Sequence, residues 1–272
     1  MSKQNQALLL DHPDIAGYLF HPRKEPDAKL PPNALELWTP VAESVSVNTR
    51  LHLTDADRPH LLFFHGNGEI ASDYDDIGPV YNKFGLNFLV SDYRGYGRSE
   101  GEPSASAMLA DAHGVFSHIR RWMEENHRNG PLWVMGRSLG SAPALELAGH
   151  YPEACRGLII ESGFAYTLDL LSRIGVPTGP YPKETGTDAE IDRINRDKIA
   201  RYPGPTLIIH AEQDGIIPLA HGKALYQASA AAVKDLRVIA GADHNTIFLT
   251  AGKSYFTLIS QFVSQASATA RT

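Results

Sequence analysis

The sequence predicts an α/β fold in which helices cover both faces of a mostly parallel sheet. Six short segments are almost continuously apolar and are bounded by turn residues, which is typical of strands buried on both faces. Segments with the apolar spacing of amphipathic helices lie between them, and this alternation is characteristic of parallel sheets. The six strand segments are residues 61–64, 86–90, 132–135, 157–160, 207–210 and 236–239.

The chain outside these strands divides into a leading segment and one domain. Residues 22–40 contain five prolines, so we expect residues 1–43 to form an irregular N-terminal segment packed on the core. Residues 44–54 alternate between apolar and polar side chains and predict one or two antiparallel edge strands. We expect residues 44–272 to form a single domain, with a short lid insertion at about 163–204, where proline, glycine and charged residues are frequent.

Three helices follow from the spacing of apolar residues. Over residues 104–123 apolar side chains recur every three or four positions, and Ser104 can cap the first turn. The same spacing recurs over residues 248–262. Residues 141–148 follow a strand directly and carry Pro143 in the first turn, which favours a helix start.

The composition excludes several classes of protein. With 272 residues, 25 Lys and Arg against 31 Asp and Glu, and a net charge of −6, the chain has too little clustered positive charge to favour nucleic-acid binding. Cys155 is the only cysteine, which excludes an intramolecular disulfide and a cysteine-based zinc site. We find neither a signal peptide nor an apolar segment of membrane-spanning length, so we expect a cytoplasmic protein without stable membrane insertion.

A candidate nucleophile lies at the end of the third predicted strand. Residues 136–140 read Gly-Arg-Ser-Leu-Gly between a strand and a helix, the context in which a G-x-S-x-G turn exposes its serine. Ser138 would lie at the helix N-terminus, where free N–H groups favour a developing negative charge. The same pattern recurs at residues 97–101, but Ser99 has no strand-to-helix turn around it, and we interpret it as a loop residue.

A serine nucleophile needs a base that is itself oriented by an acid. His244 follows the last predicted strand and is our candidate base, and Asp214 follows the strand at 207–210 and is our candidate acid. Glu161 and Glu212, which also follow strands, are alternative acids. The order serine, aspartate, histidine along the chain is one that occurs in known serine hydrolases.

Acyl transfer also requires two N–H donors for the oxyanion. Leu139, directly after the candidate nucleophile, can supply one backbone N–H, and Asn67 in the loop His65-Gly66-Asn67-Gly68 can supply the other. For substrate contacts, the candidates are Glu69, which could hold an amino group, and Phe164 and Tyr166, which could line an acyl pocket.

Four pieces of the chain together resemble the serine α/β-hydrolase superfamily. They are residues 65–68, the loop Asp92–Ser104, the turn around Ser138, and the pair Asp214 and His244. The loop is similar to that of a subgroup containing acyl-protein thioesterases, and serine aminopeptidases and monoacylglycerol lipases share a related layout. The resemblance implies an α/β-hydrolase fold and cleavage of an ester or thioester without cofactor or metal. It also implies that Arg94 and the loop Tyr93–Ser104 are structural and brace the oxyanion loop.

The lid composition refines the expected substrate. Because the segment at 163–204 is short and partly charged, we expect small or medium acyl groups rather than long lipid chains. Two alternatives remain open at this point. One is a non-catalytic binding module built on a hydrolase scaffold. The other is a dinucleotide-binding protein, because residues 66–71 match G-x-G-x-x-A and Asp92 ends the next strand.

Overall fold

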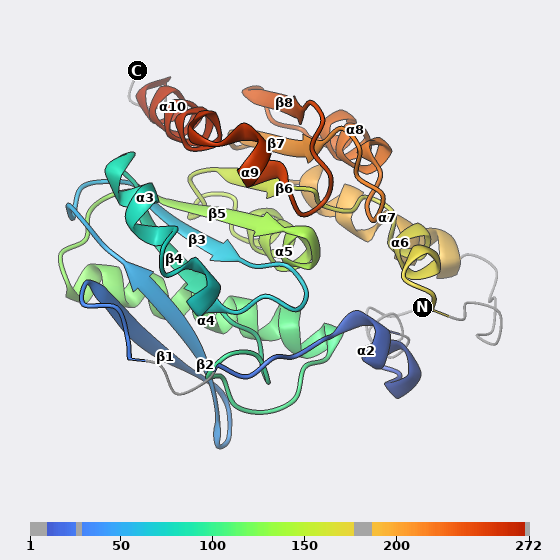
Figure 1. Cartoon of the computed structure of the whole chain (residues 1–272), viewed down its shortest axis with the longest axis horizontal. Coiled ribbons are helices and arrows are strands. Elements are labelled where there is room, and N and C mark those ends of the chain that lie inside the picture. The colour runs from blue at the N-terminus through green and yellow to red at the C-terminus, as the bar shows by residue number, and fades with distance from the viewer. Residues whose placement is uncertain (1–9, 26–28, 177–186, 270–272) are drawn as a thin grey trace.

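The computed structural model describes residues 10–25, 29–176 and 187–269, and its centre is one eight-stranded sheet. The strands lie in the order β1-β2-β4-β3-β5-β6-β7-β8 (Figure 1). Their bounds are β1 Ala34–Ala42, β2 Val45–His52, β3 His60–Phe64, β4 Asn87–Ser91, β5 Leu132–Arg137, β6 Leu158–Glu161, β7 Thr206–Ala211 and β8 Lys234–Ile239.

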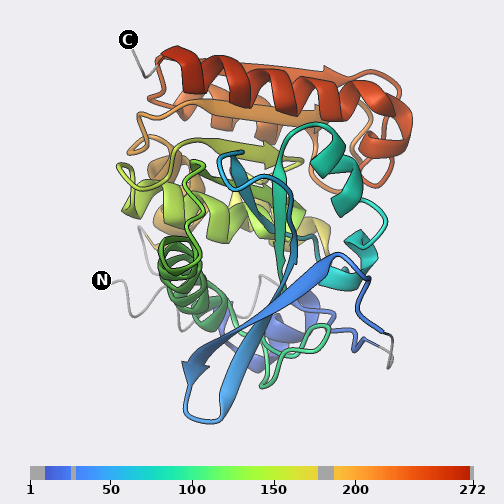
Figure 2. The same ribbon diagram turned by 90° about the vertical axis from the view of Figure 1, so that its left-hand side faces the viewer.

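The sheet is mostly parallel, as the sequence predicts. β2 pairs antiparallel with both β1 and β4, and every other neighbouring pair is parallel. All six predicted strands are present within two residues of the expected bounds. The antiparallel strand expected within residues 44–54 is β2, but it lies between β1 and β4 and is not an edge strand. Figure 2 shows the hairpin β1–β2 extending from the side of the sheet at which β1 forms the edge.

The prediction of an irregular segment over residues 1–43 is wrong for two parts. Residues 34–42 form β1, and Pro13–Leu19 form the short helix α2. Proline is tolerated in β1 because the strand lies at the sheet edge, where a missing N–H need not break a ladder of hydrogen bonds. The pairing register also shifts between Pro40 and Ala42, as expected beside such a residue.

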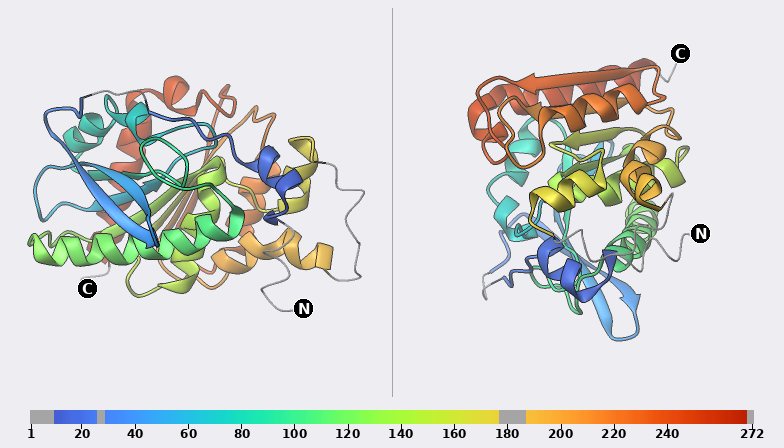
Figure 3. Two further views of the ribbon diagram at one scale, coloured as in Figure 1. Left: turned by 90° about the horizontal axis from the view of Figure 1, so that it is seen from below. Right: turned by 90° about the vertical axis from the view of Figure 1, so that its right-hand side faces the viewer.

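Helices cover both faces of the sheet (Figures 1 and 3). Alternate strand residues point to opposite faces, so Leu62 and Phe64 belong to one core while Leu61 and Phe63 belong to the other. The first core is closed mainly by α4, α5 and α8, and the second by α3, α9 and α10. These helices are α3 Gly78–Lys83, α4 Ala105–Glu125, α5 Ser141–His150, α8 Leu219–Ala228, α9 Ile247–Ala251 and α10 Lys253–Thr269.

The expected lid insertion lies between β6 and β7. It contains α6 (Thr167–Arg173) and α7 (Thr187–Ile199), and its residues 177–186 lie outside the described part of the chain. Helix α2 lies beside α6 and α7 in space, although about 150 residues separate it from them in the sequence (Figures 1 and 3). Among the described residues, no helix combines the length and the apolar character needed to cross a bilayer.

Candidate active site

Ser138 occupies a strained turn directly after β5. Its φ is +52°, which is uncommon for a residue other than glycine. A Cβ atom on Gly136 would lie 2.1 Å from the carbonyl oxygen of Gly140, and one on Gly140 would lie 2.0 Å from that of Phe64. Both flanking positions therefore require glycine, because a methyl group there would collide with the backbone.

Ser138, His244 and Asp214 come together in one hydrogen-bonded series. Ser138 Oγ lies 2.9 Å from His244 Nε2, and His244 Nδ1 lies 2.8 and 3.0 Å from the two carboxylate oxygens of Asp214. An ionised carboxylate can only accept, so Nδ1–H donates to Asp214 and Nε2 accepts the serine proton. All three side chains are buried.

The surroundings of Asp214 favour its ionised form. Burial raises its pKa, but the hydrogen bonds and positive charge of His244 and the N–H of Ile217 outweigh burial, so the pKa lies below its usual value. The backbone N–H groups of Ile216 and Ile217 donate to Asp214 Oδ1 at 3.1 and 2.8 Å. These donors fix the carboxylate in the turn that follows β7.

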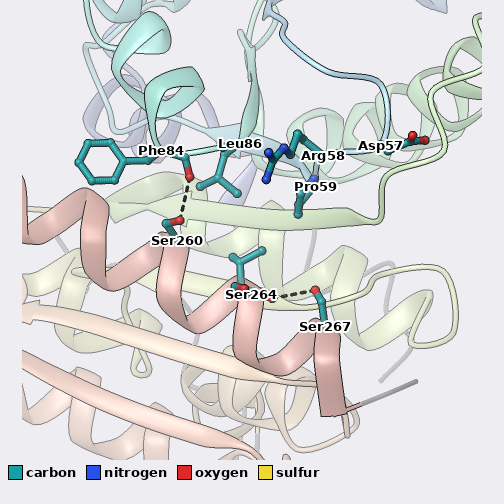
Figure 4. Close-up of a pocket in the computed structure, with 10 residues that line it drawn as sticks. Asp57, Arg58, Pro59, Phe84, Leu86, Ser260, Ser264 and Ser267 are labelled. Carbon is teal, nitrogen blue, oxygen red and sulfur yellow. Dashed lines mark hydrogen bonds between the residues drawn. The ribbon is translucent and has the colours of Figure 1, made fainter. Parts of the chain in front are cut away.

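The three residues share one edge of the sheet. They follow the carboxyl ends of β5, β7 and β8, where loops of parallel sheets form binding sites (Figure 1). A different hollow, drawn in Figure 4, is lined by residues such as Pro59, Leu86 and Ser260. Pro59 and Leu86 directly precede β3 and β4, so this hollow lies at the amino ends of the parallel strands. Ser138 lies at their carboxyl ends, and the hollow is therefore remote from it.

The two expected oxyanion donors lie in suitable local geometry. Leu139 belongs to the 3-10 turn η2 (Ser138–Gly140), and the first N–H groups of such a turn have no partner within it. Within the described part of the chain, the Asn67 N–H makes no hydrogen bond. The Asn67 side chain is held firmly, because its Oδ1 accepts from the Tyr96 hydroxyl at 2.7 Å and from the His21 N–H at 2.9 Å.

Glu69, expected as a substrate contact, is instead engaged within the protein. One oxygen pairs with the guanidinium of Arg137, and the other accepts from the Gly66 N–H at 2.7 Å and the Tyr74 hydroxyl at 2.6 Å. The carboxylate thus has three internal partners. Its charge is balanced by Arg137 and it closes the loop that carries Asn67.

Arg137 is the residue of this site that sequence reasoning overlooked. Its guanidinium donates to Glu69, to Glu161 Oε1 at 3.1 Å and to the backbone carbonyl oxygen of His244 at 2.9 Å. One side chain thus joins the loops that follow β3, β6 and β8 to the turn before Ser138. Its place as the variable residue before the serine of G-x-S-x-G was the only signal in the sequence.

Phe164 and Tyr166 lie in different surroundings. Phe164 is buried and lines an apolar pocket together with Leu139, the neighbour of Ser138. The other lining residues include Leu19 at the end of α2, Phe20 directly after it, and Ala142 on α5. Tyr166 lines a separate, more polar pocket. The structure therefore places Phe164, but not Tyr166, at the apolar pocket that Leu139 also lines.

The alternative residues are placed in structural roles. Ser99 is buried and its Oγ accepts from the Asn48 N–H at 2.9 Å, away from His244. Glu161 contacts Arg137 and the Tyr255 hydroxyl, whereas His244 Nδ1 contacts Asp214. Arg94 pairs with Asp111 of α4 through two hydrogen bonds.

The expectation that Arg94 braces the oxyanion loop is therefore wrong. The oxyanion loop, residues 65–68, is held instead by Tyr93 and Tyr96, which lie on either side of Arg94 in the loop Asp92–Ser104. The Tyr93 hydroxyl donates to the carbonyl oxygen of His65 at 2.7 Å, and Tyr96 holds Asn67 as described above. The loop has the bracing role that the resemblance implies, but through different side chains.

Sequence comparison finds that the chain is similar to known hydrolases. The family model described as "Serine aminopeptidase, S33" matches residues 55–174. The mouse alpha/beta hydrolase domain-containing protein 17C is 32% identical over 213 residues, covering 77% of this chain and 61% of the mouse protein. The chain thus spans about three fifths of the length of this relative.

Solved structures share the fold at low sequence identity. A Pyrococcus furiosus esterase superposes with a TM-score of 0.71 at 14% identity, covering 91% of this chain and 97% of the esterase. A soluble variant of the Saccharomyces cerevisiae monoglyceride lipase has a TM-score of 0.65 at 15% identity, covering 88% and 97%. The chain has the α/β-hydrolase fold. In this fold, the turn at Ser138 and the loops after β7 and β8 lie at the carboxyl ends of the parallel strands, where such sheets form binding sites.

Proposed function

We propose that this α/β hydrolase is a serine hydrolase that cleaves carboxylic esters or thioesters of small or medium acyl groups. The observation that carries the proposal is the series Ser138 Oγ, His244 Nε2 and Asp214 at 2.9 and 2.8 Å. A buried serine hydroxyl becomes a useful nucleophile only when a neutral imidazole accepts its proton, and this arrangement supplies one.

The proposed reaction has two stages. Ser138 Oγ attacks the carbonyl carbon of the substrate while its proton passes to His244 Nε2. The N–H groups of Asn67 and Leu139 bind the resulting oxyanion, and His244 returns the proton to the leaving alcohol or thiol as the acyl-enzyme forms. A water molecule, deprotonated by His244, then attacks the acyl-enzyme, and His244 returns this proton to Ser138 Oγ as the carboxylic acid leaves. Asp214 stabilises the imidazolium in both stages.

Two features support an ester or thioester substrate with an apolar acyl group. The pocket next to Leu139 is lined mainly by apolar side chains, among them Phe164 and Ala142, and suits an acyl chain. The description of the matching family raises peptide cleavage as a second possibility. An aminopeptidase needs a carboxylate to hold the substrate's amino group, and Glu69 is already paired with Arg137.

The dinucleotide alternative finds little support in the same loops. The carboxylate of Asp92, which would have to reach a ribose, is buried and accepts from the Ala71 N–H at 2.8 Å, with His65 Nε2 at 3.2 Å. The absence of side chains at Gly66 makes room for the Arg137 guanidinium, which lies 2.4 Å from where a Cβ would stand. Gly66 is thus explained without a pyrophosphate.

Hydrolysis of p-nitrophenyl acetate tests the proposed roles. Ser138→Ala should abolish turnover, whereas Ser99→Ala, in the second G-x-S-x-G pattern, should retain it. Asp214→Asn should lower kcat by about 10⁴-fold because the imidazole loses its orienting acceptor, and Glu161→Gln should have a much smaller effect. Activity in Ser138→Ala would contradict the proposal, and a mild Asp214→Asn effect beside a severe Glu161→Gln effect would reassign the acid.

A further inference from the structure

Three potential metal ligands from two helices lie together outside the proposed active site. His113 projects from α4, and Glu146 and His150 project from α5, which packs beside α4. One ligand atom of each residue lies within 4.8 Å of one ligand atom of each other residue. His113 Nε2 and Glu146 Oε1 are 3.4 Å apart.

The distance between His113 Nε2 and Glu146 Oε1 fits a tetrahedral ion. Zinc binds histidine nitrogen and carboxylate oxygen at about 2.0–2.1 Å, so two ligands of a tetrahedral zinc ion lie about 3.4 Å apart. Glu146 and His150 are four residues apart and therefore share one face of α5. His150 is the last residue of this helix, where the helix dipole and free carbonyl groups favour a cation.

The outer contacts of the cluster also suit ligation. His113 Nδ1 lies 3.1 Å from the Tyr151 hydroxyl, which leaves Nε2 directed at Glu146. Lys198 Nζ holds the second oxygen of Glu146 at 2.7 Å and leaves the first oxygen facing His113. Ligating histidines and carboxylates in proteins commonly have such partners on their remaining atoms.

We propose that His113, Glu146 and His150 form a binding site for one Zn²⁺ ion, with water as the fourth ligand. Two imidazoles and one carboxylate are a ligand set that zinc adopts in proteins, and cysteine is not required. Bound zinc would join α4 to the C-terminal end of α5, whose N-terminal end carries the turn at Ser138. This inference is independent of the proposed hydrolase function.

Calorimetric titration of the full chain with Zn²⁺ tests the site. We expect one dominant site in the wild type, and Co²⁺ in its place should give the visible absorption of a tetrahedral complex. His113→Ala, Glu146→Gln and His150→Ala should each weaken Zn²⁺ binding at least tenfold. Because His150 is exposed, His150→Ala leaves the core intact, which circular dichroism and the metal-free Tm will verify.

A matched control removes a different exposed histidine. His127 has a φ of +52°, which asparagine tolerates, so His127→Asn should bind Zn²⁺ as the wild type does. Equal Zn²⁺ affinity in the wild type and in correctly folded His150→Ala would overturn the proposal, as would a wild type that binds no Zn²⁺ at all.

Discussion

At the scale of single residues, Arg137 determines how the loops of the site sit against one another. Its guanidinium is largely buried, and burial alone would lower its pKa. The carboxylates of Glu69 and Glu161 more than compensate, so the side chain remains charged. Since the same group also donates to the carbonyl of His244, it fixes the backbone of the proposed base relative to the proposed nucleophile.

Arg137→Lys should lower kcat much more than it raises KM. A lysine has one ammonium group and cannot reach three loops at once, so His244 shifts, and a displacement of about 1 Å can cost about 10²-fold in rate. Steady-state kinetics with p-nitrophenyl acetate measure the effect. Arg98→Lys is the matched control, because Arg98 holds the same place in the second G-x-S-x-G pattern but pairs with Glu36. Wild-type kcat in Arg137→Lys would contradict this role.

The residues of the site differ in how far sequence could predict them. Ser138, Asp214 and His244 were predictable because each directly follows a strand, and parallel strands bring such positions to one edge. The contacts of Arg137 were not predictable, since they depend on how three loops converge. Glu69 was misjudged for the same reason: its neighbours in sequence do not reveal that Arg137 and Tyr74 occupy its oxygens.

At the scale of elements, the burial of a strand decides whether it can be recognised in the sequence. The strands of the parallel part are covered on both faces and therefore read as continuous apolar runs. β1 lies at the edge and is only partly buried, so its sequence carries one proline together with polar residues and gives no clear period. Helix α2 is seven residues long, too short for a periodic pattern, and it acquires its role only by packing near α6 and α7.

The start of α5 borders the apolar pocket that we assign to the acyl chain. Ala142→Leu should fill part of this pocket and leave room only for short acyl groups. We expect kcat/KM for p-nitrophenyl octanoate to fall by at least about 10- to 100-fold, because a single methylene contributes about 1–3 kcal/mol in a hydrophobic pocket. Hydrolysis of the acetate ester serves as the internal control and should change little. An unchanged ratio of octanoate to acetate activity would show that the chain binds elsewhere.

At the scale of the whole molecule, buried histidines make stability depend on pH. His52 and His60 are buried, and burial together with nearby Arg50 and Arg128 lowers the pKa of each to about 4. His60 Nε2 accepts from Arg128 Nε, a bond that requires the neutral ring. In the unfolded chain the two histidines take up protons near pH 6.5, whereas in the folded chain they do so only near pH 4. Their contribution to the free energy of unfolding is therefore complete above pH 6.5 and is lost as the pH falls toward 4.

Denaturant unfolding between pH 7 and pH 4 measures this contribution. A shift from 6.5 to about 4 corresponds to about 3 kcal/mol for each ring. His60→Gln retains an acceptor for Arg128 and does not titrate, so its free energy of unfolding should fall by about 3 kcal/mol less than that of the wild type over this range. Parallel pH profiles for the two proteins would rule out His60 as a source of the effect.

The measurement that tests the central claim most directly is the site of covalent modification by a fluorophosphonate probe. We expect peptide mass spectrometry of the treated wild type to find one adduct, on the Ser138 Oγ, because only a serine activated by a neighbouring imidazole reacts readily. Ser138→Ala should carry none. An adduct on another residue such as Ser99, or a folded wild type that remains unmodified, would contradict the assignment of Ser138 as nucleophile.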